Sequence, residues 1–228
     1  MTPTRRAATT AGVLFLVGTA AGVLSVVSAA DGPDYLREVA ANGTRVVVGS
    51  FFQCVMACAF VGVAIALHPV LTRHGPTAAA GFLGFRIAAG IFNIVGVLIL
   101  LLLLDLSNQF VGAGAPVSSH FQTLGSLLRN ARDLMNHVAM ILALSVGDVL
   151  YYWVLHRARL VPRWLSVWGF IGLALTLSAS LLVLCRLTGV VTTTYLALNA
   201  VLALQQVALA TWLIVRGLNE SAEVLPGA

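Results

Sequence analysis

Charge is scarce in this sequence of 228 residues, and lysine is missing altogether. Only 9% of the residues are charged, whereas 59% are hydrophobic. A soluble domain has about 25% charged and about 45–50% apolar residues. A chain with so few charges cannot cover a water-exposed surface. The composition therefore excludes an ordinary soluble domain and predicts a lipid bilayer as the chain's main partner.

Cysteine is also rare. Cys54, Cys58 and Cys185 all lie inside apolar runs. A disulfide framework needs paired cysteines in segments outside the membrane, so this pattern excludes one. We interpret Cys54 and Cys58, which share a helix face, as small residues that let helices pack closely.

All basic residues other than histidine are arginines, 13 in number, and the formal net charge is +5. Such a charge raises the question of nucleic-acid binding. The arginines are scattered at the ends of apolar segments, however, and form no basic stripe. We therefore predict no nucleic-acid partner.

Six apolar runs are long enough to cross a bilayer, which takes about 20 helical residues. They cover residues 7–30, 46–67, 81–104, 134–155, 164–185 and 193–215. Only helices satisfy their own backbone hydrogen bonds in such apolar segments. The sequence predicts an all-α fold: one membrane domain over residues 1–228, built as a bundle of six transmembrane helices.

The arginines between the runs predict the direction of the bundle. The connector "HRARLVPRWLSVWG" is short and carries Arg157, Arg159 and Arg163. With the N-terminus inside, seven connector arginines fall on the inner side and five on the outer side. Short basic loops stay in the cytoplasm. We expect both termini to be cytoplasmic, in a multi-pass protein of the cell membrane.

The first run and one long connector each leave two alternatives. Residues 7–30 resemble a cleavable signal peptide, but the apolar run is long, and Gly18 and Gly22 suit helix packing. We expect this helix to be retained.

Residues 106–133 begin as an irregular segment and then become amphipathic. This part is either a helix at the outer surface or an extension of the fourth span.

The block "HRARLVPRWLSVWGFIG", the later "ATWLIVRGLN", and the stretches "AGVLFLVGTAAGVLS" and "VAIALHPVLTRHG...GFLGFR" resemble an uncharacterised family of bacterial integral membrane proteins, domain of unknown function 4386. The resemblance covers nearly the whole chain. It implies a multi-span membrane protein and brings no activity or cofactor. Relatives often carry glutamate where this chain has Ala89 and Gln206, so the resemblance does not carry over a chemistry that depends on those acids.

Two ionisable residues lie within the predicted spans. Arg86 is about five residues from the inner end of the third run, and Asp148 is about seven from the inner end of the fourth. Both lie roughly 8–11 Å deep, on successive antiparallel helices. A charged side chain at membrane depth costs free energy, so its presence points to a structural or functional role. We predict an ion pair, with Gln206 and Asn93 as candidate polar neighbours. This pair is either a structural clip or part of a ligand or proton site.

A second polar group lies toward the outer side of the spans and consists of Gln53, Asn136, His137 and Asn199. Such residues often form hydrogen bonds between helices, so they either hold the bundle together or line a small polar cavity. The histidines lack the spacing of a helical metal site. We predict no metal and no cofactor, while haem between His68 and His156 stays a remote alternative.

Three classes of function follow from these residues. The first is a non-catalytic bundle with a structural or regulatory role, which we favour. The second is binding or transport of a small molecule or proton through a polar core around Arg86 and Asp148. The third is a membrane-embedded enzyme, which is the least supported because the sequence shows no constellation of catalytic residues. A protein partner or small ligand is not identified by the sequence.

Overall fold

The computed structural model describes residues 2–116, 120–190 and 192–219, and this part of the chain is helical with no β-strand. Its helices, with two short turns of 3₁₀ (η1) and π (η2) type, are α1 (Pro3–Leu24), η1 (Ser28–Ala30), α2 (Tyr35–Ala41), α3 (Gly43–Leu71), α4 (Pro76–Gly112), α5 (His120–Leu134), η2 (Met135–Ala139), α6 (Met140–Arg157), α7 (Arg163–Leu184) and α8 (Thr193–Val215). Six of the segments are long and apolar enough to cross a membrane, with α5, η2 and α6 counted as one. The predicted all-α bundle of six spans is confirmed.

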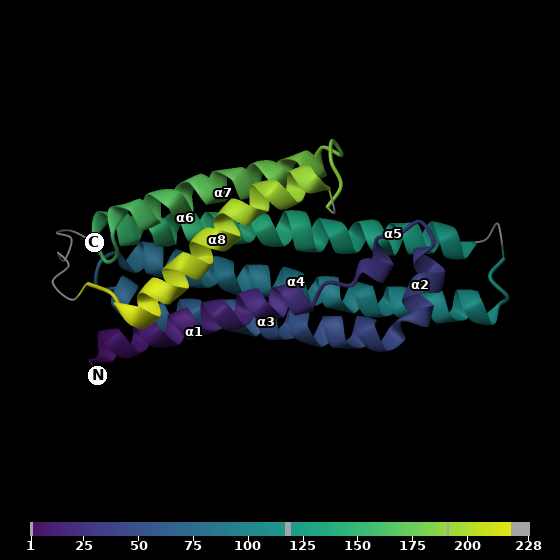
Figure 1. The fold of residues 1–228 in the computed structure, drawn as a ribbon, viewed down its shortest axis with the longest axis horizontal. Helices are drawn as coiled ribbons and strands as arrows, with labels where there is room; N and C mark the ends of the chain where they lie inside the picture. Colours follow the sequence, from purple (N-terminus) through teal and green to yellow (C-terminus); the bar gives the residue numbers. More distant parts are fainter. Residues whose placement is uncertain (1, 117–119, 191, 220–228) are drawn as a thin grey trace.

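The spanning helices pack as a closed ring. In Figure 1, α1, α3 and α4 form one side of the bundle and α6 and α7 the other, with α8 crossing between them. Successive spans contact one another, and α8 also contacts α1. One apolar core lies inside this ring and includes Phe15, Leu67, Phe82, Leu155 and Leu209. The ring brings the third and fourth spans, α4 and α6, into direct contact.

The first and last spans meet where the chain begins and α8 ends. We call this the terminal end of the bundle and the opposite one the far end (Figure 1). The guanidinium of Arg5 donates to the C=O groups of Leu213, Ile214 and Val215 at 3.3, 2.6 and 3.0 Å. These carbonyls have no partner within their own helix, and a cation there is also favoured by the helix dipole. Arg5 thereby caps α8 and ties it to α1.

The far end projects beyond the shorter helices. At 1.5 Å per residue, α4 is about 55 Å long, whereas α7 is about 33 Å. Figure 1 shows α2, α5 and the adjoining parts of α3 and α4 extending past the α7–α8 turn. A second apolar cluster, which includes Leu36, Val39 and Phe110, holds this part together. The bundle thus carries a small helical cap beyond the ends of α7 and α8.

Several predicted boundaries differ from the structure at this end. The first predicted run extends to residue 30, whereas α1 ends at Leu24. Residues 106–112 were expected to be irregular, but they continue α4 to Gly112. Residues 31–45, between the first two predicted spans, contain helix α2 and the first residues of α3. For the amphipathic stretch that follows, the second alternative is correct: α5 runs through η2 into α6 as an extension of the fourth span.

Small residues permit close helix contacts along α1. A Cβ atom at Gly18 would come within 2.8 Å of the Phe60 ring of α3, and one at Gly12 within 2.7 Å of the Ala210 carbonyl of α8. The predicted packing role of Gly18 therefore agrees with its surroundings. The same role does not hold for Cys58, which is exposed, and Cys54 is only partly buried.

Candidate functional site

The ion pair between α4 and α6 is the centre of the candidate site. Nη2 of Arg86 lies 2.6 Å from Oδ1 of Asp148. The two side chains are only 1% and 3% exposed. The structure thus brings together the two charged residues that the sequence placed at the same depth. A bond this short between buried charges joins the third and fourth spans directly.

Aromatic rings enclose the guanidinium of Arg86. Its Cζ atom lies 5.7, 5.4 and 5.2 Å from the ring centres of Phe15, Phe60 and Phe82, which come from α1, α3 and α4. Each ring presents a partly negative face to the cation. Tyr151 stacks on Phe82 with ring centres 4.8 Å apart. Four helices therefore contribute to the environment of one cation, which no single motif reveals.

The buried polar side chain of α8 on the side of Tyr152 is Gln205. The Tyr152 hydroxyl, one turn from Asp148, donates to Oε1 of Gln205 at 2.7 Å, and Nε2 of Gln205 donates to the Leu165 C=O of α7 at 3.0 Å. Gln205 is fully buried, whereas Gln206 is partly exposed and has no hydrogen bond to Arg86 or Asp148. The two glutamines lie about 100° apart around the helix, and it is Gln205 that faces the interior of the bundle.

A layer of amides lies further toward the far end. Nδ2 of Asn93 donates to the backbone C=O of Gln53 at 3.2 Å, so Asn93 joins α4 to α3 and belongs to this layer rather than to the ion pair. Asn136 lies in the π turn, and its amide fills the space that a Cβ atom at Gly96 would need. A π turn widens the helix by one residue, and such turns often accompany functional sites.

His137 follows Asn136 in the π turn but faces another helix. Its Nδ1 lies 2.8 Å from the Tyr195 hydroxyl of α8. Asn199 was expected in the same group, but its amide donates to the Tyr195 backbone C=O of its own helix at 2.8 Å. The outer polar group is therefore divided into an amide layer around Asn93 and Asn136 and a separate contact between His137 and Tyr195.

Several buried polar atoms in these layers have no hydrogen-bond partner in the described structure. They include Oδ1 of Asn93, Oδ1 of Asn136, Oε1 of Gln53 and the hydroxyl oxygen of Ser50. In folded proteins such atoms are nearly always satisfied, and an exception needs an explanation. The amide layer is therefore a place where a small polar molecule would find acceptors.

Charged contacts hold the far-end cap on the bundle. Arg132 of α5 contacts Asp31 at 2.8 Å and its neighbour Asp133 at 2.9 Å. Arg129 donates to the Asp31 and Gly32 carbonyls at 2.8 and 3.1 Å. The same guanidinium lies 5.4 Å from the ring centre of Tyr35.

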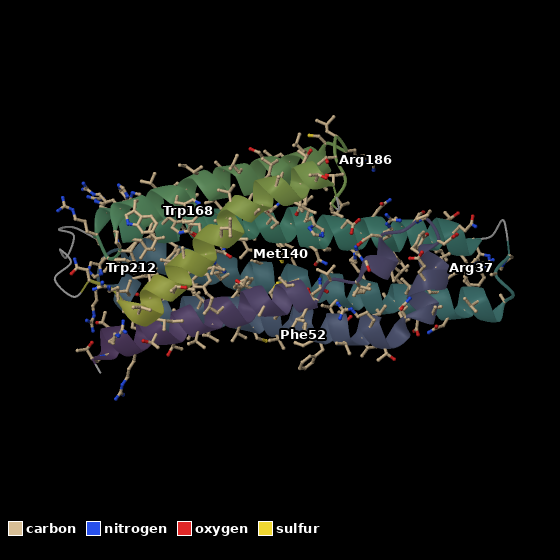
Figure 2. All side chains as sticks on the ribbon, viewed as in Figure 1. Arg37, Phe52, Met140, Trp168, Arg186 and Trp212 are labelled. Atoms are coloured by element: carbon tan, nitrogen blue, oxygen red, sulfur yellow. The ribbon has the colours of Figure 1, made fainter. Side chains whose placement is uncertain are left out.

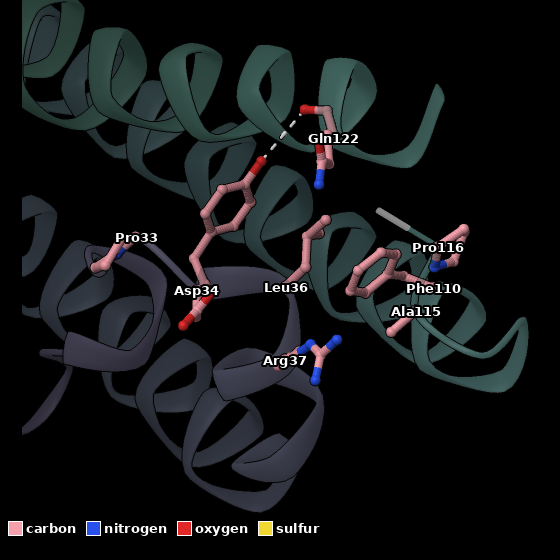
Figure 3. A pocket seen from close by; sticks show the side chains of 9 residues that line it. Pro33, Asp34, Leu36, Arg37, Phe110, Ala115, Pro116 and Gln122 are labelled. Carbon is pink, nitrogen blue, oxygen red and sulfur yellow. Dashed lines mark hydrogen bonds between the residues drawn. The ribbon is translucent and has the colours of Figure 1, made fainter. Parts of the chain in front are cut away.

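The cap also contains a surface pocket of about 490 Å³ between α2 and the α4–α5 region, lined by residues that include Asp34, Arg37 and Phe110 (Figure 3). The Tyr35 hydroxyl beside it donates to the Gln122 C=O at 3.3 Å. Burial raises the pKa of Tyr35, against the opposing effect of the Arg129 cation, so the hydroxyl stays protonated as a donor. The pocket carries one charge of each sign and has no set of groups suited to a particular chemistry.

The arginines of the α6–α7 connector lie at the terminal end. Arg157, Arg159 and Arg163 are all exposed, and the Cζ atom of Arg157 lies 5.2 Å from the ring centre of Trp153.

Within the described ranges, no three His, Cys, Asp or Glu side chains come together as a metal site. The site offers a buried salt bridge and hydrogen-bonding amides, which suit helix association or solute binding.

The sequence matches one family model, whose description assigns no function. A family model described as "Domain of unknown function (DUF4386)" matches residues 10–217, which include all the site residues. No curated protein and no solved structure matches the chain.

Proposed function

We propose that this chain, which belongs to the DUF4386 family, is a non-catalytic multi-pass protein of the cell membrane with a structural or regulatory role. The observation that carries the proposal is the enclosure of the Arg86–Asp148 pair. A transport or proton site must exchange with water on at least one side. Here the two charges are bonded to each other, both side chains are buried, and aromatic rings surround the guanidinium, as expected of a clip between helices.

Proton flux tests this proposal. The purified chain is reconstituted into liposomes that contain a pH-sensitive dye, and a pH gradient is imposed. We expect wild-type vesicles to lose the gradient no faster than empty vesicles, and Asp148→Asn to change nothing. Flux through the wild type that disappears in Asp148→Asn would contradict the proposal, provided that the variant remains folded in detergent.

The proposed orientation has both termini in the cytoplasm. At the terminal end, the described residues include no carboxylate and carry the arginines Arg5, Arg6, Arg73, Arg157, Arg159, Arg163 and Arg216. The described far end carries as many carboxylates as arginines, with acids at positions 31, 34, 38, 105 and 133 and arginines at positions 37, 45, 129, 132 and 186. Arginine excess marks the cytoplasmic side. Thr72→Cys is expected to resist an impermeant thiol reagent in intact cells, whereas Asp34→Cys is expected to react.

A second candidate function is the binding of a small polar molecule in the amide layer. It is favoured by the unpartnered buried oxygens of Asn93 and Asn136 beside the π turn. In a chain without native cysteines, Asn136→Cys would then react with a small thiol reagent applied from the far end. Lack of reaction, with Asp34→Cys reacting as a control, would argue that the amides only hold helices together.

A further inference from the structure

A surface pocket of about 400 Å³ lies at the terminal end, between the α6–α7 connector and the end of α8. Its walls combine charged, aromatic and apolar residues: Arg159, Leu160, Val161, Pro162, Arg163, Trp212, Arg216, Gly217, Leu218 and Asn219. Figure 2 shows side-chain nitrogen atoms gathered at this end of the bundle, near the labelled Trp168 and Trp212. Neither the ion pair nor the amide layer includes any of these residues.

The pocket concentrates positive charge, and none of the described residues that line it is acidic. Arg159, Arg163 and Arg216 come from three different segments and are all exposed. None of them forms an ion pair with another described residue. Three guanidinium groups around one hollow repel one another unless an anion lies between them. Arginine forks match the oxygens of phosphate particularly well.

The backbone holds this arrangement in place. Helix α6 ends in a Schellman turn, in which the Leu160 N–H donates to the Leu155 C=O at 3.1 Å and Arg159 takes a positive φ of 52°. The Asn219 N–H donates to the Leu160 C=O at 2.9 Å, which ties the end of α8 to this turn. The three arginines are therefore carried by segments that are fixed relative to one another.

The start of α7 adds to the positive potential. The helix begins at Arg163 after Pro162, and no side chain caps its first N–H groups. These groups and the helix dipole favour an anion at this position. The effect reinforces the charge of the three guanidinium groups on the same hollow.

The surroundings of the pocket match the level of lipid headgroups. Trp212 lines it, and Trp164 and Trp168 stack nearby on α7 with ring centres 6.3 Å apart. Tryptophan is enriched where hydrocarbon meets water. The floor is apolar, with Leu160 and Leu218 buried. A ligand that fits has a phosphate at the arginines and an apolar part along the helices.

We propose that this pocket binds the phosphate group of an anionic phospholipid. The lipid's acyl chains would lie along the apolar surfaces of α7 and α8, and its headgroup would bridge the two segments. Near a membrane surface, each arginine strengthens the binding of anionic lipid by about fivefold. Loss of all three arginines is therefore expected to weaken binding by well over tenfold.

The test measures lipid binding to the full chain in neutral detergent by native mass spectrometry. The chain is titrated with phosphatidylglycerol and, separately, with phosphatidylcholine of the same acyl chains. We expect tighter binding of phosphatidylglycerol to the wild type. The variant Arg159→Gln/Arg163→Gln/Arg216→Gln is expected to lose this preference. An unchanged preference in this variant would overturn the proposal.

A matched control distinguishes lipid binding in the pocket from general electrostatic attraction of anionic lipid to the basic end of the bundle. Arg6, Arg73 and Arg157 are also exposed at the terminal end but do not line the pocket. The variant Arg6→Gln/Arg73→Gln/Arg157→Gln removes the same charge and should keep most of the preference. An equal loss in both triple variants would contradict a localised site and leave only diffuse attraction. Thermal unfolding of each variant checks that it is folded.

Inorganic phosphate distinguishes the two sources of the anion. Phosphate at millimolar concentration is added without lipid, and protection against thermal unfolding is measured. We expect weak protection that depends on Arg159, Arg163 and Arg216, and stronger protection by phosphatidylglycerol. Protection by phosphate that the lipid does not exceed would overturn the assignment to a phospholipid.

Discussion

Removal of one partner of the Arg86–Asp148 pair is the perturbation with the largest expected effect. Asp148→Ala leaves the Arg86 guanidinium buried at 2% exposure without its carboxylate. A buried charge that loses its partner costs about 3–5 kcal/mol. An ordinary hydrogen bond between membrane helices is worth only about 0.6 kcal/mol. The single variant should therefore lose several times more stability than the loss of a helix contact would explain.

A double substitution distinguishes the stability that the ion pair contributes from the free-energy cost of leaving one charge buried without its partner. Arg86→Met/Asp148→Leu removes both charges and keeps apolar bulk between α4 and α6. Such replacements of buried pairs are often nearly neutral. We expect the double variant to be more stable than either single variant, with a coupling energy of about 2 kcal/mol or more.

The differences in the free energy of unfolding are measured by reversible unfolding in mixed micelles that contain increasing amounts of a denaturing detergent. Tryptophan fluorescence reports the fraction of unfolded protein. Each variant is compared with the wild type in the same lipid mixture. Single variants within about 1 kcal/mol of the wild type, with effects that simply add in the double variant, would refute the account of the pair as a clip between helices.

Three further substitutions test contacts elsewhere in the bundle by the same unfolding measurement. Gly96→Ala is expected to cost about 1–3 kcal/mol because its Cβ would overlap the Asn136 amide, and the additional change Asn136→Ala should recover most of the loss. Tyr152→Phe should cost about 0.5–1.5 kcal/mol by removing the hydrogen bond to α8, and no loss would contradict that role. Gly217→Ala should cost about 1–2 kcal/mol, because Gly217 has φ of 79° and its Cβ would lie 2.6 Å from Nη1 of Arg5; full stability would show that the cap of α8 is not formed.

The number of spans could be predicted because hydropathy reports contact with lipid, and the same property explains where the predicted boundaries fail. The predicted third span ended at residue 104, just before Asp105, whereas α4 continues to Gly112 in the cap. A polar residue ends a hydrophobic run without ending a helix. The π turn at Met135–Ala139 has no recognised sequence signal, so its presence could only be seen in the structure.

The ion pair could be predicted because two charges of opposite sign at equal depth have few alternatives within a membrane. Its neighbours could not be predicted in the same way. Helix α8 is apolar around most of its circumference, so sequence alone does not decide which of Gln205 and Gln206 faces inward. Two of the three rings around Arg86, Phe15 and Phe60, come from other helices, and the sequence offers seven further phenylalanines for that role.

The ends of helices α6 and α7 are also difficult to predict from the sequence. Arg159 and Arg186 occupy positive-φ positions after α6 and α7, where glycine is the usual residue. The sequence therefore lacks the expected glycine signal at these turns. A cation near the C-terminus of a helix is favoured by the dipole, which offsets part of the backbone cost.

The most direct measurement of the central claim is the accessibility of position 148 to water. Cys54, Cys58 and Cys185 are replaced by serine, Asp148→Cys is introduced, and a small membrane-impermeant thiol reagent is applied to intact cells and to inside-out vesicles. Thr72→Cys and Asp34→Cys report the two sides as controls. The account predicts no reaction at position 148 from either side. Reaction from one side, with the controls behaving as expected and the variant folded, would contradict a sealed pair and favour a hydrated ligand or proton site.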